Sequence, residues 1–149
     1  MKEIIMPQQE QEKENITNKN KSMLQQPDIA LDKAIVTRVN QRRKLSIHGT
    51  PIQYQKITPP GTKSMAMFMV LAEPTQSTGD KFLHHGGDET LLVLSGHLEV
   101  DLHDHKEKLN PGDSLFIPRG TLHRVTNTGT VNAEAIFVLS PPEYTEGEH

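Results

Sequence analysis

The chain of 149 residues contains no cysteine. Disulfide bonds, thiolate metal ligands and a cysteine nucleophile are therefore all excluded. The absence is also typical of proteins in a reducing compartment, so a cytoplasmic location is the default expectation.

Long apolar runs and strong charge of one sign are also missing. No segment approaches the roughly 18 apolar residues that a transmembrane helix needs, and the opening "MKEIIMPQQE" is too weakly apolar for a signal peptide. The net charge is −3 and both signs are interspersed, so we expect neither a membrane nor nucleic acid as a partner. The basic stretch "QRRKL" at 41–45 is predicted to be a solvated loop.

Apolar residues make up only 34% of the chain, and part of that deficit lies at the N-terminus. Gln, Asn, Glu and Lys supply 16 of the first 26 residues. Such a segment has little apolar surface to offset its ordering entropy. We therefore predict a polar flexible tail over 1–27, one domain over 28–143 and a short polar tail over 144–149.

From about residue 45 onward the pattern is that of short strands separated by Gly/Pro turns. No window of about 11 residues there shows a convincing helical period. "DHKEK" at 104–108 is predicted to turn the chain. Predicted strands cover 51–58, 64–72, 90–95, 97–103, 114–118, 122–127 and 133–140. This spacing favours an all-β sandwich or small barrel.

Two good metal ligands stand at the start of the strand in "HGGDETLLVLSG" at 85–96. Residues an even number apart share a face of a strand, so His85, Glu89, Leu91 and Val93 point the same way if the geometry is extended throughout. The intervening glycine pair makes this inference weaker for His85. Inward-facing donors are costly to bury unless something binds them, and a cation would remove that cost.

His123 follows a Pro-x-Gly turn and supplies a third donor. Two imidazoles and one carboxylate form a facial triad that leaves coordination positions open. Such a site suits non-haem iron(II) best, and Mn, Ni, Co or Zn are also compatible.

These residues resemble the two motifs of the cupin superfamily. The second motif, G-x5-P-x-G-x2-H-x3-N, is matched at Gly112, Pro118, Gly120, His123 and Asn127. The second half of the first motif, G-x5-H-x-H-x3,4-E-x6-G, is matched at His85, Glu89 and Gly96. The resemblance covers about residues 50–141 and implies a double-stranded β-helix, the jelly-roll cupin barrel, as a single domain.

The first motif departs from the family pattern in one informative way. Its first histidine would fall at Leu83, or at Phe82 if His84 is the second histidine, so one of the usual four ligands is missing. The resemblance therefore implies a two-His-one-Glu set. This variant is similar to the cupin domain of hydroxypropylphosphonic acid epoxidase and to cupin domains fused to helix-turn-helix regulators, although no helix-turn-helix pattern precedes this domain.

The resemblance implies a small metal-binding cupin that acts on a small molecule. A non-haem iron oxygenase or dioxygenase and a metal-dependent isomerase or lyase are both compatible with an open-sided site. The alternative is a binding or sensing module for a sugar or organic acid without turnover. With no Trp and two Tyr, stacking platforms for a sugar are scarce.

Further candidate site residues follow from the alternation of side chains along a strand. Tyr54 and Lys56 share a face; on the inner face they are candidate acid/base or anion-binding groups, and the outer face is equally open. "HDH" at 103–105 is predicted to be a solvated turn, and His84 to point away from the site. Apolar residues expected to line the pocket are Met67, Met69, Leu91, Val93, Val125 and Phe137.

Assembly is predicted from the strands at 64–72 and 90–95, which are apolar on both faces. One face of such a strand lines the interior, so the other leaves an exposed apolar band in a monomer. We therefore expect a two-fold homodimer.

Overall fold

The computed structural model describes residues 32–47, 49–79, 82, 84 and 86–142. The chain divides into two compact units, Met1–Ala34 and Ile35–His149, and the fold described below is that of the second. The polar tails predicted over 1–27 and 144–149 lie outside the described residues.

Regular structure in the described part of the second unit is almost entirely β. The elements are η1 (Val39–Gln41, a 3-10 helix), β1 (Arg43–Leu45), β2 (Gln53–Lys56), β3 (Ala66–Ala72), β4 (Asp88–Ser95), β5 (Leu98–Asp101), β6 (Lys106–Leu109), β7 (Ser114–Ile117), β8 (Arg124–Thr126) and β9 (Ala133–Ser140). No helix among the described residues has the length and apolar character needed to cross a bilayer. The predicted all-β class is confirmed.

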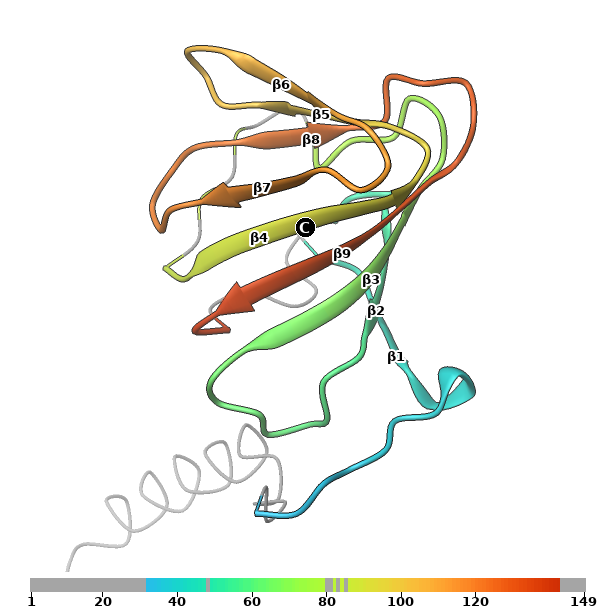
Figure 1. The fold of residues 1–149 in the computed structure, drawn as a ribbon, viewed down its shortest axis with the longest axis vertical. Coiled ribbons are helices and arrows are strands. Elements are labelled where there is room, and N and C mark those ends of the chain that lie inside the picture. Colours follow the sequence, from blue (N-terminus) through green and yellow to red (C-terminus); the bar gives the residue numbers. More distant parts are fainter. Residues whose placement is uncertain (1–31, 48, 80–81, 83, 85, 143–149) are drawn as a thin grey trace, which may run out of the picture. The chain divides into compact units, whose positions relative to one another are not determined.

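The strands form two sheets in which every pairing is antiparallel. The larger sheet has the order β1-β2-β3-β9-β4-β7 and the smaller the order β6-β5-β8 (Figure 1). Strand β9, the last in sequence, lies between β3 and β4. Strands distant in the sequence are thus neighbours at the centre of the larger sheet.

Alternation along each strand decides which side chains form the core. In β3 the burial alternates from Ala66 to Ala72, with Phe68 and Val70 buried and the residues between them only partly so. Cross-strand pairing carries the same inner face to β9, where Phe137 lies opposite Phe68. Val125 of the smaller sheet joins the same apolar cluster. The two inner faces therefore share one core.

Two strands were not predicted. Arg43–Leu45, read as part of a solvated loop, forms β1, and Lys106–Leu109, read as a turn, forms β6. Both are edge strands of their sheets. Charged side chains are common on edge strands because they discourage pairing with other chains, and they hide the apolar alternation on which a strand prediction depends.

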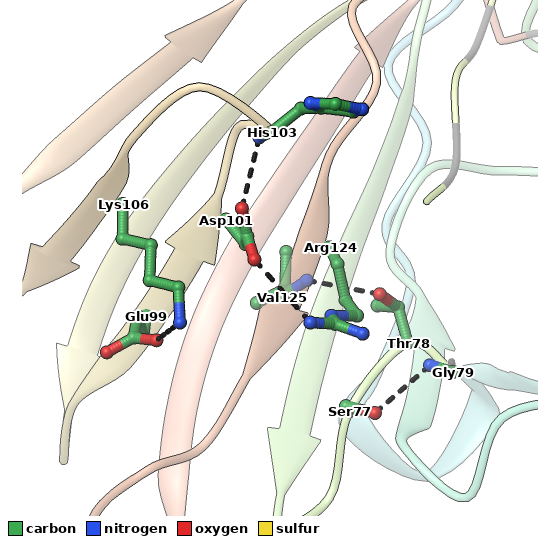
Figure 2. A network of polar contacts seen from close by, with 9 residues as sticks. All are labelled: Ser77, Thr78, Gly79, Glu99, Asp101, His103, Lys106, Arg124 and Val125. Carbon is green, nitrogen blue, oxygen red and sulfur yellow. Dashed lines mark hydrogen bonds and ion pairs between the residues drawn. The ribbon is translucent and has the colours of Figure 1, made fainter. Parts of the chain in front are cut away.

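Strand β8 is held on its second side by the segment that follows β3. The Thr78 amide donates to the Val125 carbonyl (2.9 Å), and the Val125 amide donates to the Thr78 hydroxyl (3.1 Å) (Figure 2). Further along, the Thr75 amide donates to the Asn127 carbonyl and the Asn127 amide to the Gln76 carbonyl, both at 2.9 Å. This pairing fixes β8, and with it the residue that precedes it, His123.

Candidate metal centre

Glu89 and His123 reach toward each other from the two sheets. Glu89 in β4 lies opposite Leu139 and Ile117, which are both buried, so its side chain shares their inner face. His123 stands two residues before buried Val125 and points to the same interior. Their closest atoms, His123 Nε2 and Glu89 Oε2, are 3.2 Å apart, and the residues are only 2% and 6% exposed.

The backbone sets the orientation and tautomer of His123. Its Nδ1 lies 2.9 Å from the Thr121 carbonyl oxygen. A carbonyl can only accept a hydrogen bond, so Nδ1 carries the hydrogen and Nε2 directs its lone pair at Glu89. Two acceptors at this separation require a proton or another cation between them. The sequence held no signal for this backbone anchor, which is the outer-shell contact that a ligating histidine needs.

The electrostatics of the pair favour positive charge. Burial by itself lowers the pKa of His123, but the hydrogen bond and negative charge of Glu89, together with the Thr121 carbonyl, outweigh it and hold that pKa above its usual range. A proton is therefore attracted to this position, and the same field would attract a metal ion.

A buried imidazole nitrogen and a buried carboxylate oxygen that face each other are donors that fit a divalent transition metal. The third predicted ligand, His85, lies outside the described residues. Among the residues that the structure describes, no group of three or more metal-binding side chains occurs. The structure thus brings together two of the three predicted ligands.

The segment between His85 and Glu89 is pressed against the end of β9. A Cβ atom on buried Gly87 would lie 2.2 Å from the Pro141 carbonyl oxygen. Only a residue without a side chain fits at this distance. The glycine therefore has a packing role that fixes the chain two residues before Glu89.

Tyr54 and Lys56, whose face the sequence left open, lie on the inner face. Tyr54 is buried and packs edge-to-face against Phe68 and Phe137, with ring centroids 6.0 and 6.1 Å apart. Burial, and secondarily the charge of Glu89, raise the pKa of Tyr54 far above its usual value, so its hydroxyl stays protonated. Lys56 lies opposite Phe68 and is partly buried.

Of the six residues predicted to line a pocket, four face the interior and two lie on the outer face of the larger sheet. Leu91, Val93, Val125 and Phe137 are buried in the shared core. Met67 and Met69 lie on the outer face of β3 and are only partly buried, because Phe68 between them points inward. Because both faces of this strand carry apolar residues, the sequence did not show which alternate residues point inward.

The remaining histidines near the motifs lie away from the pair. "HDH" at 103–105 lies at the hairpin between β5 and β6, where the His105 side chain is 54% exposed beside Asp104. His84 is exposed. The exposed hairpin position of His105 agrees with the predicted solvated turn.

With the fold and the inward-facing pair established, comparison with known families is direct. Residues 68–139 match the model of the cupin domain. The chain belongs to the cupin superfamily. The resemblance carried by the two motifs is confirmed, and the two-sheet architecture is the cupin jelly roll.

Three similar proteins are described by sequence identity, coverage and, for two of them, structural superposition. TcmJ, a tetracenomycin polyketide synthase protein of Streptomyces glaucescens, is 32% identical over 68 residues, or 46% of this chain and 45% of TcmJ. The polyketide cyclase RemF of Streptomyces resistomycificus superposes with a TM-score of 0.64 at 17% identity, covering 76% of this chain and 84% of RemF. Iron(II) HppE superposes with a TM-score of 0.61 at 24% identity, covering 72% of this chain and 61% of HppE.

These matches establish the fold more firmly than the activity. The matched segments span 45% to 60% of the length of the curated Streptomyces relatives.

Proposed function

We propose that this cupin is a metal-dependent enzyme that acts on a small carbonyl compound by proton transfer, as an isomerase, lyase or cyclase. His85, Glu89 and His123 would hold the metal, with iron(II) favoured and Mn, Ni, Co or Zn compatible. The observation that carries the proposal is the buried His123–Glu89 pair, which joins the two sheets at 3.2 Å. When bound, the metal would polarise a carbonyl or hydroxyl oxygen.

The chain's own residues suit proton transfer. The Tyr54 hydroxyl is protonated and lies near enough to Glu89 to feel its charge. In that position it would donate a hydrogen bond to an oxygen of the substrate and stabilise negative charge that develops there. Lys56 on the same inner face would attract an acidic substituent. Leu91, Val125 and Phe137 would exclude water, which strengthens these polar contacts.

The named relatives support carbonyl-rich substrates. TcmJ is named for a polyketide synthase and RemF as a polyketide cyclase. Polyketide chains carry many enolisable carbonyl groups, and a metal beside a phenol is suited to such groups. The oxygenase reading is supported instead by the two-His-one-carboxylate donor set, which is typical of non-haem iron oxygenases.

A substrate screen of metal-loaded protein, with and without oxygen, tests the proposal. The panel contains β-diketones, hydroxy acids, phosphonates and uronates. Oxygen-independent turnover of a carbonyl compound is the expected result. Turnover only with oxygen would select the oxygenase, and tight binding without turnover would select the sensing module. Protein that holds well under one equivalent of any of these metals would overturn the metal-dependent function.

Replacing Tyr54 by phenylalanine is expected to lower kcat by about 100-fold, the scale seen when one hydrogen-bond donor to a developing oxyanion is lost. The ring contacts with Phe68 and Phe137 are kept, so folding and metal content should stay unchanged. Steady-state kinetics with the substrate from the screen measure the effect. Tyr144→Phe, which changes the chain's other tyrosine, is the matched control. Wild-type kcat in the Tyr54 variant would rule out its role as a hydrogen-bond donor to the substrate.

We also propose that the protein forms a two-fold homodimer through the outer face of the larger sheet. Cross-strand register places apolar residues side by side on that face. They are Met67, Met69, Leu92, Phe116, Ile136 and Val138. Phe116 is 59% exposed. A partner chain would cover this band, and apolar patches of this kind usually mark an interface.

Truncation distinguishes the dispensable tail from a segment that takes part in assembly. Deleting 1–26 is expected to leave the melting temperature, metal content and dimer unchanged, because that segment has few apolar groups. A cut at residue 40 should weaken the dimer, because Ile35, Val36 and Val39 carry exposed apolar side chains that a partner subunit would bury. Light scattering at tens of micromolar protein measures the oligomeric state of both truncated chains. A monomeric full-length chain would contradict the proposed assembly.

A further inference from the structure

Asp88 joins the start of β4 to the turn that follows β7. The β4–β7 ladder ends at the pair Glu89–Ile117, near the point where β4 begins and β7 ends (Figure 1). One residue before Glu89, Asp88 Oδ1 accepts a hydrogen bond from the Arg119 backbone amide at 2.9 Å. The Arg119 Nε atom lies 3.5 Å from the same oxygen. A side-chain contact therefore continues the connection between the two strands after their backbone pairing has ended.

The turn that Asp88 holds has a defined shape. It runs from Pro118 to Thr121, whose amide donates to the Pro118 carbonyl at 3.2 Å. Gly120, the third residue of the turn, has a φ of 76°. A type II turn requires a positive φ at this position, and glycine adopts it without steric cost. The amide that Asp88 accepts from belongs to the second residue, so this one contact holds the turn against β4.

The same turn ends on the group that orients His123. The Thr121 carbonyl oxygen lies 2.9 Å from His123 Nδ1, and His123 Nε2 lies 3.2 Å from Glu89 Oε2. Glu89 is in turn covalently bonded to Asp88. The contacts and the chain thus form a closed ring that runs from Asp88 through the turn and His123 to Glu89. A shift of the turn relative to β4 would therefore move His123 Nε2 relative to the Glu89 carboxylate.

We propose that Asp88 is a positioning residue for the candidate metal centre. Its hydrogen bond to the turn sets the place of the Thr121 carbonyl, which directs His123 at Glu89. The inference rests on the proposed metal-binding function. Side chains alternate along β4, so Asp88 points away from the interior that Glu89 faces, and its side chain is 37% exposed. It acts through the turn and not as a ligand.

Cobalt(II) titration against a competing chelator tests this role in the full-length protein. Asp88→Ala removes the acceptor and is expected to weaken cobalt binding about 5-fold, less than the roughly 10-fold loss expected for a direct partner of a metal ligand. Asp88→Asn keeps a side-chain oxygen for the Arg119 amide, and Arg119→Gln keeps that amide while removing the guanidinium. Both should bind cobalt with the wild-type affinity, because an exposed ion pair contributes little and the hydrogen bond is kept.

Asp113→Ala is the matched control. Asp113 Oδ2 accepts the Asn110 backbone amide at 2.9 Å in the turn before β7, so this variant removes the same kind of contact at the other end of that strand. A merely structural role would lower the melting temperature of both alanine variants and change their cobalt affinity alike, or not at all. Either result would overturn the inference while leaving the proposed metal site intact. An equal loss in Asp88→Asn would also overturn it, because the charge and not the hydrogen bond would then be responsible.

If the wild type binds no metal, the proposed function fails, and amide hydrogen exchange in metal-free protein decides whether Asp88 holds the turn. The Thr121 amide, which closes the turn on Pro118, is the reporter. Faster exchange of this amide in Asp88→Ala than in Asp113→Ala supports the positioning role. Equal exchange in the two variants overturns it.

Discussion

Replacing His123 or Glu89 by alanine is expected to abolish metal binding, with affinity reduced by more than about 100-fold because a ligand costs more than its outer-shell partner. Both side chains are buried and face each other at 3.2 Å. Each variant would leave the other donor without its neighbour, and a site of two ligands holds a divalent ion weakly. His85→Ala is expected to give the same loss, because the two motifs imply it as the third ligand.

His105→Ala is the matched control for these variants. His105 also has acidic neighbours, with Asp104 at 2.7 Å and Glu107 at 3.4 Å, but it is exposed at a hairpin. Metal content after chelator treatment and reloading with iron, manganese, nickel or zinc measures the effect. Retention of metal in His123→Ala, or an equal loss in His105→Ala, would show that the ligands are assigned wrongly.

The largest expected loss of stability comes from Asn127→Ala. The Asn127 side chain is fully buried; Nδ2 donates to the Ala72 and Val131 carbonyls at 2.9 and 2.8 Å, and Oδ1 accepts from the Gly129 amide at 2.9 Å. Alanine would remove all three hydrogen bonds, of which the one to the Ala72 carbonyl is buried and the other two are partly buried. We expect the free energy of unfolding to fall by about 3 kcal/mol, and the melting temperature by about 10 °C.

Thermal and denaturant unfolding of metal-free protein measure that loss. Asn132→Ala is a suitable control, because Asn132 is exposed in the same turn region. Asn127→Asp keeps the acceptor for Gly129 but loses both donated bonds and buries a charge, so it should be at least as harmful. A change within a few tenths of a kcal/mol for Asn127→Ala would mean that water replaces the lost contacts.

The central strands were predictable because burial imposes a pattern on their sequence. The segment 133–140 is recovered as β9 over Ala133–Ser140, since its alternate residues fill the core. The edge strands β1 and β6 were missed because they carry charge where a central strand carries apolar residues. In β6 only Leu109 is buried, and one apolar residue makes no pattern.

Some features of the candidate site were likewise predictable from the sequence, and others were not. His123 and Glu89 were found because their spacing from turn-forming glycines is fixed by the backbone. Met67 and Met69 were placed on the wrong face, since period-two reasoning needs a polar face for reference and β3 has none. The Thr121 carbonyl that orients His123 is only two residues away in the sequence, but the residue pattern does not reveal the backbone geometry that directs it at the ring.

The position of β9 has a kinetic consequence. This strand leaves the ribosome after all the others, yet it separates β3 from β4, and Leu139 lies beside Glu89. Contacts of such long sequence separation make folding slow, on the millisecond-to-second scale typical of all-β domains. During synthesis the edges of β3 and β4 stay unpaired until β9, the strand that pairs with both, has been made. The nascent chain is therefore open to aggregation and chaperone capture until residues 133–140 emerge.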